Sequence, residues 1–153
     1  MSIEENKKLI EKWYLALADG DFETIFDMHH ENVIYNMVGS TPVSGRLYGK
    51  KACCHNMIGQ KLIEKLVPGK IKFSKKWKII AAEGDRVVGL MEGGGPTKNG
   101  EEYNQTYCEI FTLKDSKIIE LHAFFDTVLV EHCLFENSLE KKPQEILDPF
   151  QIK

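Results

Sequence analysis

The sequence has few of the features that mark a secreted, membrane-spanning or metal-built protein. Its 153 residues include only five prolines and four cysteines, and no cysteine lies in a Cys-x-x-Cys pair or at zinc-finger spacing from a histidine. No apolar run approaches the ~18 residues of a membrane-spanning helix. The first eight residues have no apolar core of a signal peptide. We therefore expect a cytoplasmic protein with free thiols, no metal and no membrane partner.

Charge of one sign is also lacking. The chain has 20 Lys and Arg against 23 Asp and Glu, which gives a net charge of -3. Proteins that bind nucleic acid through their whole surface are strongly basic, so nucleic acid is not an expected partner. What is present is ordinary: 42% of the residues are hydrophobic and 28% are charged. These fractions fit one globular domain of this length.

The apolar residues change their period along the chain. Helical spacing predicts helices at about 5–18, 22–28 and 50–66, with a strand at 32–38 and a loop at 39–45 between the last two. A period of two then predicts strands at about 70–82, 86–92, 103–113 and 117–125, joined by turns at 83–85, 93–100 and 114–116. Helices followed by strands favour an α+β fold, with the helices on one face of a bent antiparallel sheet.

Three segments resemble a known superfamily. They read Trp13-Tyr-Leu-Ala-Leu-Ala-Asp-Gly-Asp21, Gly39-Ser-Thr-Pro-Val-Ser-Gly45 and Lys117-Ile-Ile-Glu-Leu-His-Ala-Phe-Phe-Asp-Thr127. Together they resemble the nuclear transport factor two-like superfamily, in its SnoaL-like and ketosteroid-isomerase-like branch. The resemblance implies a SnoaL-like domain over residues 1–135. Residues 136–153 are then a C-terminal tail, either a lid or a loose end.

This resemblance implies a cone-shaped fold, the cystatin-like α+β barrel, in which a curved and mostly antiparallel sheet wraps around the N-terminal helices. The cone encloses a deep, mostly apolar cavity. Chemistry in such a cavity is carried out by a few carboxylates, tyrosines and histidines, usually without a cofactor. An apolar cavity disfavours the charged form of a carboxyl group, so its pKa rises and it becomes useful as an acid or base.

The catalytic residues of ketosteroid isomerase are only partly retained. The resemblance places Trp13 where the isomerase has its catalytic tyrosine, and Asn36 where it has its general base. Its second oxyanion-hole acid corresponds to Glu109, which keeps a carboxyl group. One of three roles is retained, so isomerisation of steroids by that mechanism is not expected.

The more distant limonene epoxide hydrolase gives a second comparison. Asn36 matches its asparagine, and Glu92 matches one of its two catalytic aspartates. Its arginine and its second aspartate correspond to Leu90 and Ala123, neither of which transfers a proton. We therefore expect no epoxide hydrolysis by the hydrolase mechanism.

Strand alternation predicts which side chains face the cavity, because successive residues point to opposite faces. If Ala123, Glu109 and Glu92 face inward, the wall comprises Leu90, Glu92, Tyr107, Glu109, Phe111, Leu121, Ala123 and Phe125. The outer face then carries His122 and Phe124, and in this superfamily that face commonly joins two subunits. We expect a homodimer through it.

Structural explanations exist for each candidate. Glu92 precedes three glycines and fits a solvated strand end, and Asn36 fits a hydrogen-bonding residue at a strand end. Trp13 is of a type more often found in the core than on a ligand. Glu109 is the more surprising charge, because apolar residues flank it in the middle of a strand.

The sequence thus predicts a small cofactor-free enzyme that acts by acid–base chemistry on a hydrophobic, cyclic small molecule. The reaction is an isomerisation, a cyclisation or a hydrolysis. Glu109 and Glu92 are the predicted proton-transfer groups, and Asn36, Tyr107 and Trp13 are expected to hold polar atoms of the substrate. Two alternatives stay open: a non-catalytic binding protein with the same cavity, and a protein–protein adaptor.

Overall fold

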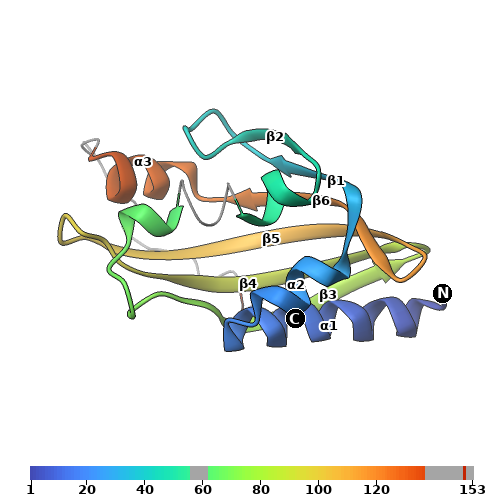
Figure 1. Cartoon of the computed structure of the whole chain (residues 1–153). Coiled ribbons are helices and arrows are strands. Elements are labelled where there is room, and N and C mark those ends of the chain that lie inside the picture. Colours follow the sequence, from blue (N-terminus) through green and yellow to red (C-terminus); the bar gives the residue numbers. More distant parts are fainter. Residues whose placement is uncertain (56–61, 137–149, 151–153) are drawn as a thin grey trace.

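The computed structural model describes residues 1–55, 62–136 and 150, and its centre is a curved sheet of six strands (Figure 1). The strand order is β2-β1-β6-β5-β4-β3. The neighbours β1 and β6 run parallel, and all other neighbours are antiparallel. The strands are β1 (His29–Met37), β2 (Gly45–Tyr48), β3 (Lys72–Glu83), β4 (Arg86–Pro96), β5 (Glu102–Lys114) and β6 (Lys117–Phe125). The predicted α+β fold is confirmed.

The first helix, α1 (Ile3–Asp19), forms where the apolar spacing predicts it. It begins with a capping box, in which Ser2 and Glu5 satisfy each other's backbone N–H groups. It ends at Gly20, whose φ of 71° is the left-handed conformation that glycine adopts without strain. Its buried face packs against β3 and β4, and in Figure 1 it runs along that side of the sheet.

The second predicted helix is present, and the third is present over the part of it that the structure describes. Asp21 caps α2 (Phe22–Met28), as expected. The predicted helix at 50–66 begins with helical turns over residues 50–55, and the 3-10 helix η2 (Ile63–Lys65) lies near its predicted end. Residues 56–61 lie outside the described part of the chain, so the middle of that prediction is untested.

The four predicted C-terminal strands are present, but β4 is longer than expected. It continues through Gly93, Gly94 and Gly95 to Pro96, where the sequence suggested a turn. The glycines are explained by close packing, because a Cβ atom on Gly93 would lie 2.7 Å from the Cα of Phe73 on β3. A glycine run that permits close approach of neighbouring strands looks the same in sequence as a turn.

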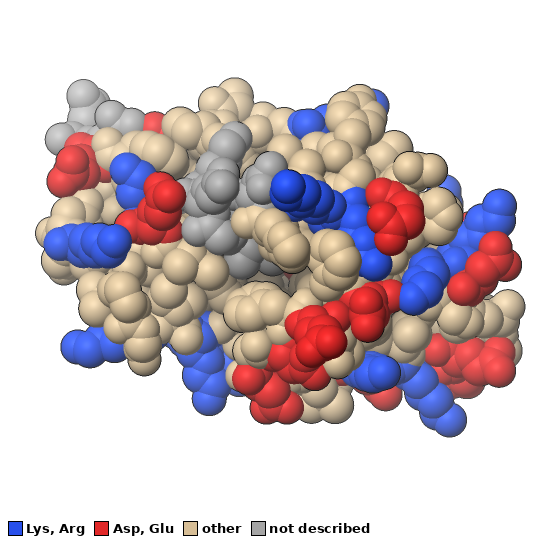
Figure 2. Space-filling view, viewed as in Figure 1, with Lys and Arg blue, Asp and Glu red and all other residues tan. Residues whose placement is uncertain are grey.

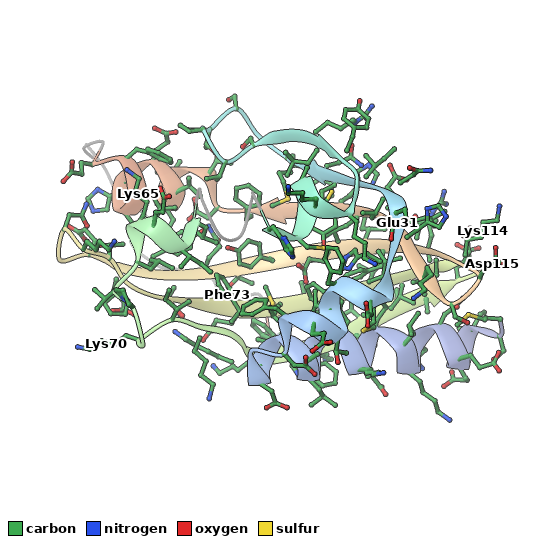
Figure 3. The ribbon with its side chains drawn as sticks, in the orientation of Figure 1. Glu31, Lys65, Lys70, Phe73, Lys114 and Asp115 are labelled. Carbon is green, nitrogen blue, oxygen red and sulfur yellow. The ribbon has the colours of Figure 1, made fainter. Side chains whose placement is uncertain are left out.

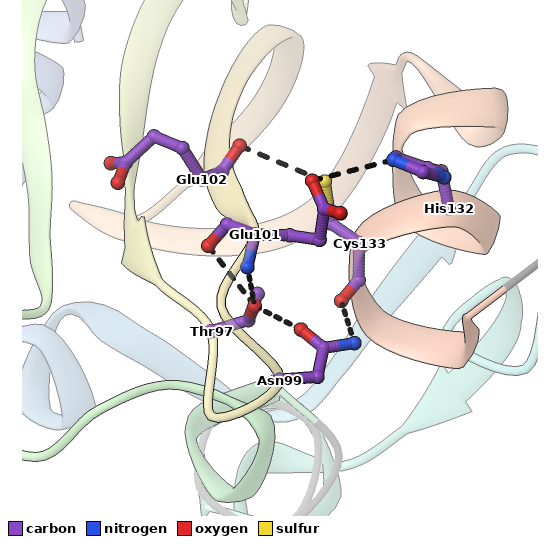
Figure 4. A network of polar contacts seen from close by, with 6 residues as sticks. All are labelled: Thr97, Asn99, Glu101, Glu102, His132 and Cys133. Carbon is purple, nitrogen blue, oxygen red and sulfur yellow. Dashed lines mark hydrogen bonds and ion pairs between the residues drawn. The ribbon is translucent and has the colours of Figure 1, made fainter.

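A helix that the sequence reading missed follows the sheet. Asp126 caps α3 (Thr127–Phe135). The loop between β4 and β5 is tied to this helix, since Asn99 Nδ2 donates to the carbonyl of Cys133 at 3.3 Å and His132 pairs with Glu101 at 3.4 Å (Figure 4). Beyond Glu136, the predicted lid or loose end lies outside the described residues except for Phe150.

Acidic and basic side chains are mixed over the face seen in Figure 2, with Asp and Glu gathered where α1 and α2 lie. No continuous basic surface appears on that face, in keeping with the net charge of -3. Of the helices in the described ranges, none is both long enough and apolar enough to cross a membrane.

Candidate functional site

A pocket lies between the curved sheet and α1, and its wall is almost entirely apolar. Of the described residues that line it, Glu109 is the only one with a carboxyl group. The volume of the pocket, measured as the space open to the centre of a water molecule, is about 70 Å³. One water needs roughly 10–15 Å³ by the same measure. The pocket therefore has room for several waters or for one small, compact ligand.

Six of the residues proposed from sequence lie in this wall: Trp13, Tyr107, Glu109, Leu121, Ala123 and Phe125. Phe111 is fully buried, but it lies in the core beside the pocket, where its ring meets that of Trp13 at 5.1 Å between centroids. Phe73 adds a wall residue from β3 and lies in the interior of the molecule (Figure 3).

The structure corrects the expected positions of Leu90 and Glu92. In the register of β4 and β5, Met91 pairs with Tyr107, while Leu90 and Glu92 pair with Cys108 and Thr106. Side chains alternate across a strand, so a shift of one residue moves a whole set to the other face. Met91 therefore lines the pocket, and Leu90 and Glu92 lie on the outer face of the sheet.

On the outer face, Glu92 has an ion-pair partner and Leu90 is buried. Glu92 Oε2 lies 3.8 Å from the Nζ of Lys76, and both side chains are at least partly exposed. Leu90 is buried there, 4% exposed. Neither residue contributes to the pocket wall.

Asn36 is displaced from the cavity by the same kind of shift. Its neighbours Tyr35 and Met37 line the pocket, whereas Asn36 pairs with His122 in the register of β1 and β6. On that outer face its side chain donates to Glu120 at 2.9 Å and accepts from Arg46 at 2.7 Å. This network satisfies the amide, so Asn36 is not a pocket group.

Glu109 is the central polar group of the pocket. Its side chain is 4% exposed, and burial raises its pKa to about 8. Tyr14 on α1 donates its hydroxyl to Glu109 Oε2 at 2.9 Å, which lowers the pKa and so offsets part of that shift. The structure records no hydrogen bond from a described residue to the other oxygen, Oε1. The carboxyl is thus held on one side and remains available on the other.

Tyr14 is a functional residue that the sequence reading missed, because the family comparison assigned the isomerase tyrosine position to Trp13. The Tyr14 ring stacks on Trp77 with centroids 5.3 Å apart and meets Trp13 edge-on at 5.2 Å. Its hydroxyl occupies the space above Gly89, which pairs with Glu109 across β4 and β5. A Cβ on Gly89 would collide with that hydroxyl.

Other polar atoms of the wall are few. The hydroxyls of Tyr103 and Tyr107 lie 3.1 Å apart, so one of them donates to the other. The Tyr35 hydroxyl lies 2.6 Å from His29 Nε2. The indole N–H of Trp13 is buried and has no hydrogen-bond partner among the described residues.

Metal ligation finds no support in the part of the chain that is described. No three or more His, Cys, Asp and Glu side chains within it are grouped so that they could hold an ion. The four cysteines are all free thiols.

Comparisons with known proteins bear on the fold and the family. The model of the SnoaL-like domain matches residues 10–121. No curated protein sequence was found to match the chain.

Several solved structures share the fold. An NTF2-like protein of Burkholderia thailandensis is 18% identical with a TM-score of 0.73, over 87% of this chain and 98% of that one. An LEH-like epoxide hydrolase of M. tuberculosis is 20% identical with a TM-score of 0.63, over 88% and 92%. TerC, co-crystallized with polyporic acid, is 20% identical with a TM-score of 0.66, over 85% and 98%. At these identities the likeness shows the fold alone.

Proposed function

The chain belongs to the SnoaL-like family, as its sequence segments predict, and from this premise we propose that it is an acid–base enzyme for a small, mostly apolar molecule. Glu109 is the proton-transfer group. The observation that carries the proposal is a buried carboxyl with a pKa near 8 in an apolar pocket. The co-crystallization of TerC, which shares the fold, with polyporic acid adds support for a small-molecule ligand.

The surroundings of Glu109 suit it to the role of a general base. A base is most effective when its pKa lies near the operating pH. Burial raises the pKa of Glu109 to about 8, close to neutral pH. Tyr14 fixes the orientation of the group through Oε2, which leaves Oε1 for the reacting proton. Apolar walls keep bulk water from solvating the carboxylate and weakening it as a base.

A single carboxyl in the described wall favours isomerisation over hydrolysis. Hydrolysis uses one group to activate water and another to protonate the leaving group. Ala123 lines the pocket with a methyl group at the position that the resemblance to limonene epoxide hydrolase assigns to the second aspartate. Isomerisation can use a single proton-transfer group for both of its steps. Glu109 takes a proton from a carbon beside a carbonyl, the electron pair of the broken C–H bond enters an enolate, and Glu109 returns the proton to another carbon of the same molecule.

A small ketone tests this proposal. We expect the protein to convert cyclohex-3-enone to its conjugated isomer cyclohex-2-enone. The rise in ultraviolet absorbance of the conjugated product measures the rate. The base must be ionised to accept the proton, so kcat/KM should rise with pH and level off above a midpoint of about 8. A rate that falls with rising pH over the same interval would assign Glu109 the role of an acid instead.

A non-catalytic binding protein is the second candidate, and Ala123 is the observation that favours it. The wall has one carboxyl and no second acid or base at the position of that alanine. Binding of cyclohex-3-enone, seen as saturable changes in amide chemical shifts, without any conversion above the buffer rate would replace the first candidate by this one.

We also propose a homodimer through the outer face of β5 and β6. Phe124 is 44% exposed there and pairs with Cys108, and the adjacent pair is His122 with Ile110. The resemblance to the superfamily, in which this face commonly joins two subunits, is the ground for the proposal, and Phe124 is the exposed apolar side chain that a second copy would cover. Light scattering at micromolar concentration should give twice the chain mass, and Phe124→Asp should give a monomer. A monomeric wild-type chain would contradict the dimer.

A further inference from the structure

Tyr35 and His29 form a buried pair at the pocket that the proposed proton transfer does not use. Tyr35 lies in the pocket wall on β1, and His29 begins the same strand. The Tyr35 hydroxyl is 2.6 Å from His29 Nε2, and His29 Nδ1 is 2.6 Å from the backbone carbonyl of Ile25. Three groups therefore form a chain that leads from the pocket to the end of α2.

The carbonyl at the end of this chain determines the direction of both hydrogen bonds. A carbonyl oxygen only accepts, so the hydrogen of the imidazole must be on Nδ1. His29 is 1% exposed, and burial lowers its pKa to about 4, so the ring is neutral at physiological pH. In a neutral ring the second nitrogen accepts. Tyr35 must then donate its only hydroxyl hydrogen to Nε2.

The consequence for the pocket is that Tyr35 has no hydrogen left to donate. Its oxygen retains a lone pair, so toward any further group it can act only as an acceptor. We propose that Tyr35 is a fixed hydrogen-bond acceptor of the pocket, held so by His29, and that among ligands of the same shape the pocket prefers the one that places a hydroxyl or N–H group beside Tyr35. Cyclohex-3-enone lacks such a group and is a minimal substrate in this respect. The proposal rests on the binding role of the pocket in the proposed function and adds the polar group that the ligand carries.

The physical basis of the selection is the cost of an unmatched pair of polar atoms. A ligand with a carbonyl or ether oxygen at this position would place two acceptors against each other. A ligand with a methyl group there would leave the remaining lone pair of the Tyr35 oxygen unmatched, and the contact would add no affinity. His29 is a positioning residue in this scheme, since it acts on the ligand only through Tyr35.

Phenol and toluene are suitable probes, because they have nearly the same shape and differ by a hydroxyl in place of a methyl group. Their affinities for the wild-type chain, for Tyr35→Phe and for Tyr48→Phe are measured from amide chemical-shift titrations. Tyr48 is an exposed tyrosine of β2 and serves as the control. The affinity ratio of phenol to toluene should fall about three- to tenfold in Tyr35→Phe, the effect of one hydrogen bond. It should be unchanged in Tyr48→Phe.

A second measurement on the wild-type chain tests the role of His29 and does not depend on any variant folding. The ¹⁵N shifts of the His29 ring at neutral pH should show hydrogen on Nδ1 and none on Nε2. The opposite tautomer would overturn the proposal, and so would a ratio that changes less than twofold in Tyr35→Phe. Failure of both probes to bind would overturn the binding role of the pocket as well. Absence of ketone isomerisation would affect only the proposed function.

Discussion

Glutamine in place of Glu109 is expected to slow the isomerisation of cyclohex-3-enone by about 10²–10⁴-fold, the usual effect of removing a general base. Glutamine has nearly the shape of glutamate and still accepts the hydrogen bond that Tyr14 donates to Oε2. It does not ionise, so it takes up no proton from the substrate. The expected loss is therefore in kcat, with the affinity for the ketone changed far less.

Glu92→Gln is the matched control for this experiment. It makes the same chemical change one strand away, on the outer face of the sheet beside Lys76. Turnover should stay within about twofold of the wild-type rate, as is usual for surface substitutions. A large loss of turnover in Glu92→Gln, or a loss of turnover below tenfold in Glu109→Gln, would show that Glu109 is not the general base.

The titration of Glu109 provides an independent check on the same group. Its side-chain carboxyl carbon, assigned by the signal that Glu109→Gln removes, should titrate with a midpoint of about 8. A solvated glutamate titrates near ~4.3. A midpoint in that lower range would mean that the carboxyl is hydrated or paired, and its role as a base near neutral pH would be abandoned.

The position of Glu109 follows from sequence for a simple physical reason. A charge between Cys108 and Ile110 in the middle of a strand stands out from its neighbours. The strand period places it on the same face as Tyr107 and Phe111, which are expected to point inward. The same period places Leu121, Ala123 and Phe125 together in the pocket wall. Sequence reasoning succeeds here because β5 and β6 are regular over these residues and joined by a short turn.

Sequence reasoning fails where the register depends on distant contacts. The glycine run after Glu92 looks like a turn, yet β3 packs closely over it and β4 continues to Pro96. An alignment that is one residue out moves Glu92 from the outer face to the pocket, and the same error moves Asn36. Single-sequence patterns contain no information on which of two adjacent residues a neighbouring strand will pair with.

The pair formed by Tyr14 and Gly89 shows a second limit. Tyr14 belongs to the apolar stripe of α1 and resembles any other core aromatic in sequence. Gly89 resembles any strand glycine, because the phenol that fills its missing side chain comes from a residue 75 positions earlier. Only the folded chain brings the two together with Glu109.

Alanine in place of Gly89 is expected to destabilise the protein by about 1–3 kcal/mol, the range for overfilling a packed core. The new Cβ would collide with the Tyr14 hydroxyl and would lie 2.9 Å from Cε2 and Cζ of the same ring. That ring is fully buried, stacked on Trp77 and in edge-on contact with Trp13, so moving it would disturb the core. Alanine also restricts the unfolded chain, which alone would stabilise by about 0.4–1 kcal/mol. A net loss in urea unfolding therefore reports the collision.

Tyr14→Phe separates this collision from any general intolerance of a side chain at Gly89. It removes the oxygen that the Cβ strikes, so Gly89→Ala should cost about 1 kcal/mol less in the Tyr14→Phe background, a coupling expected for groups in direct contact. Tyr14→Phe alone should raise the titration midpoint of Glu109, because the hydrogen bond that it removes favours the ionised carboxyl. Equal costs of Gly89→Ala in both backgrounds would mean that the new Cβ does not collide with the Tyr14 hydroxyl. An unmoved Glu109 midpoint in Tyr14→Phe would mean that the phenol does not donate a hydrogen bond to the carboxyl.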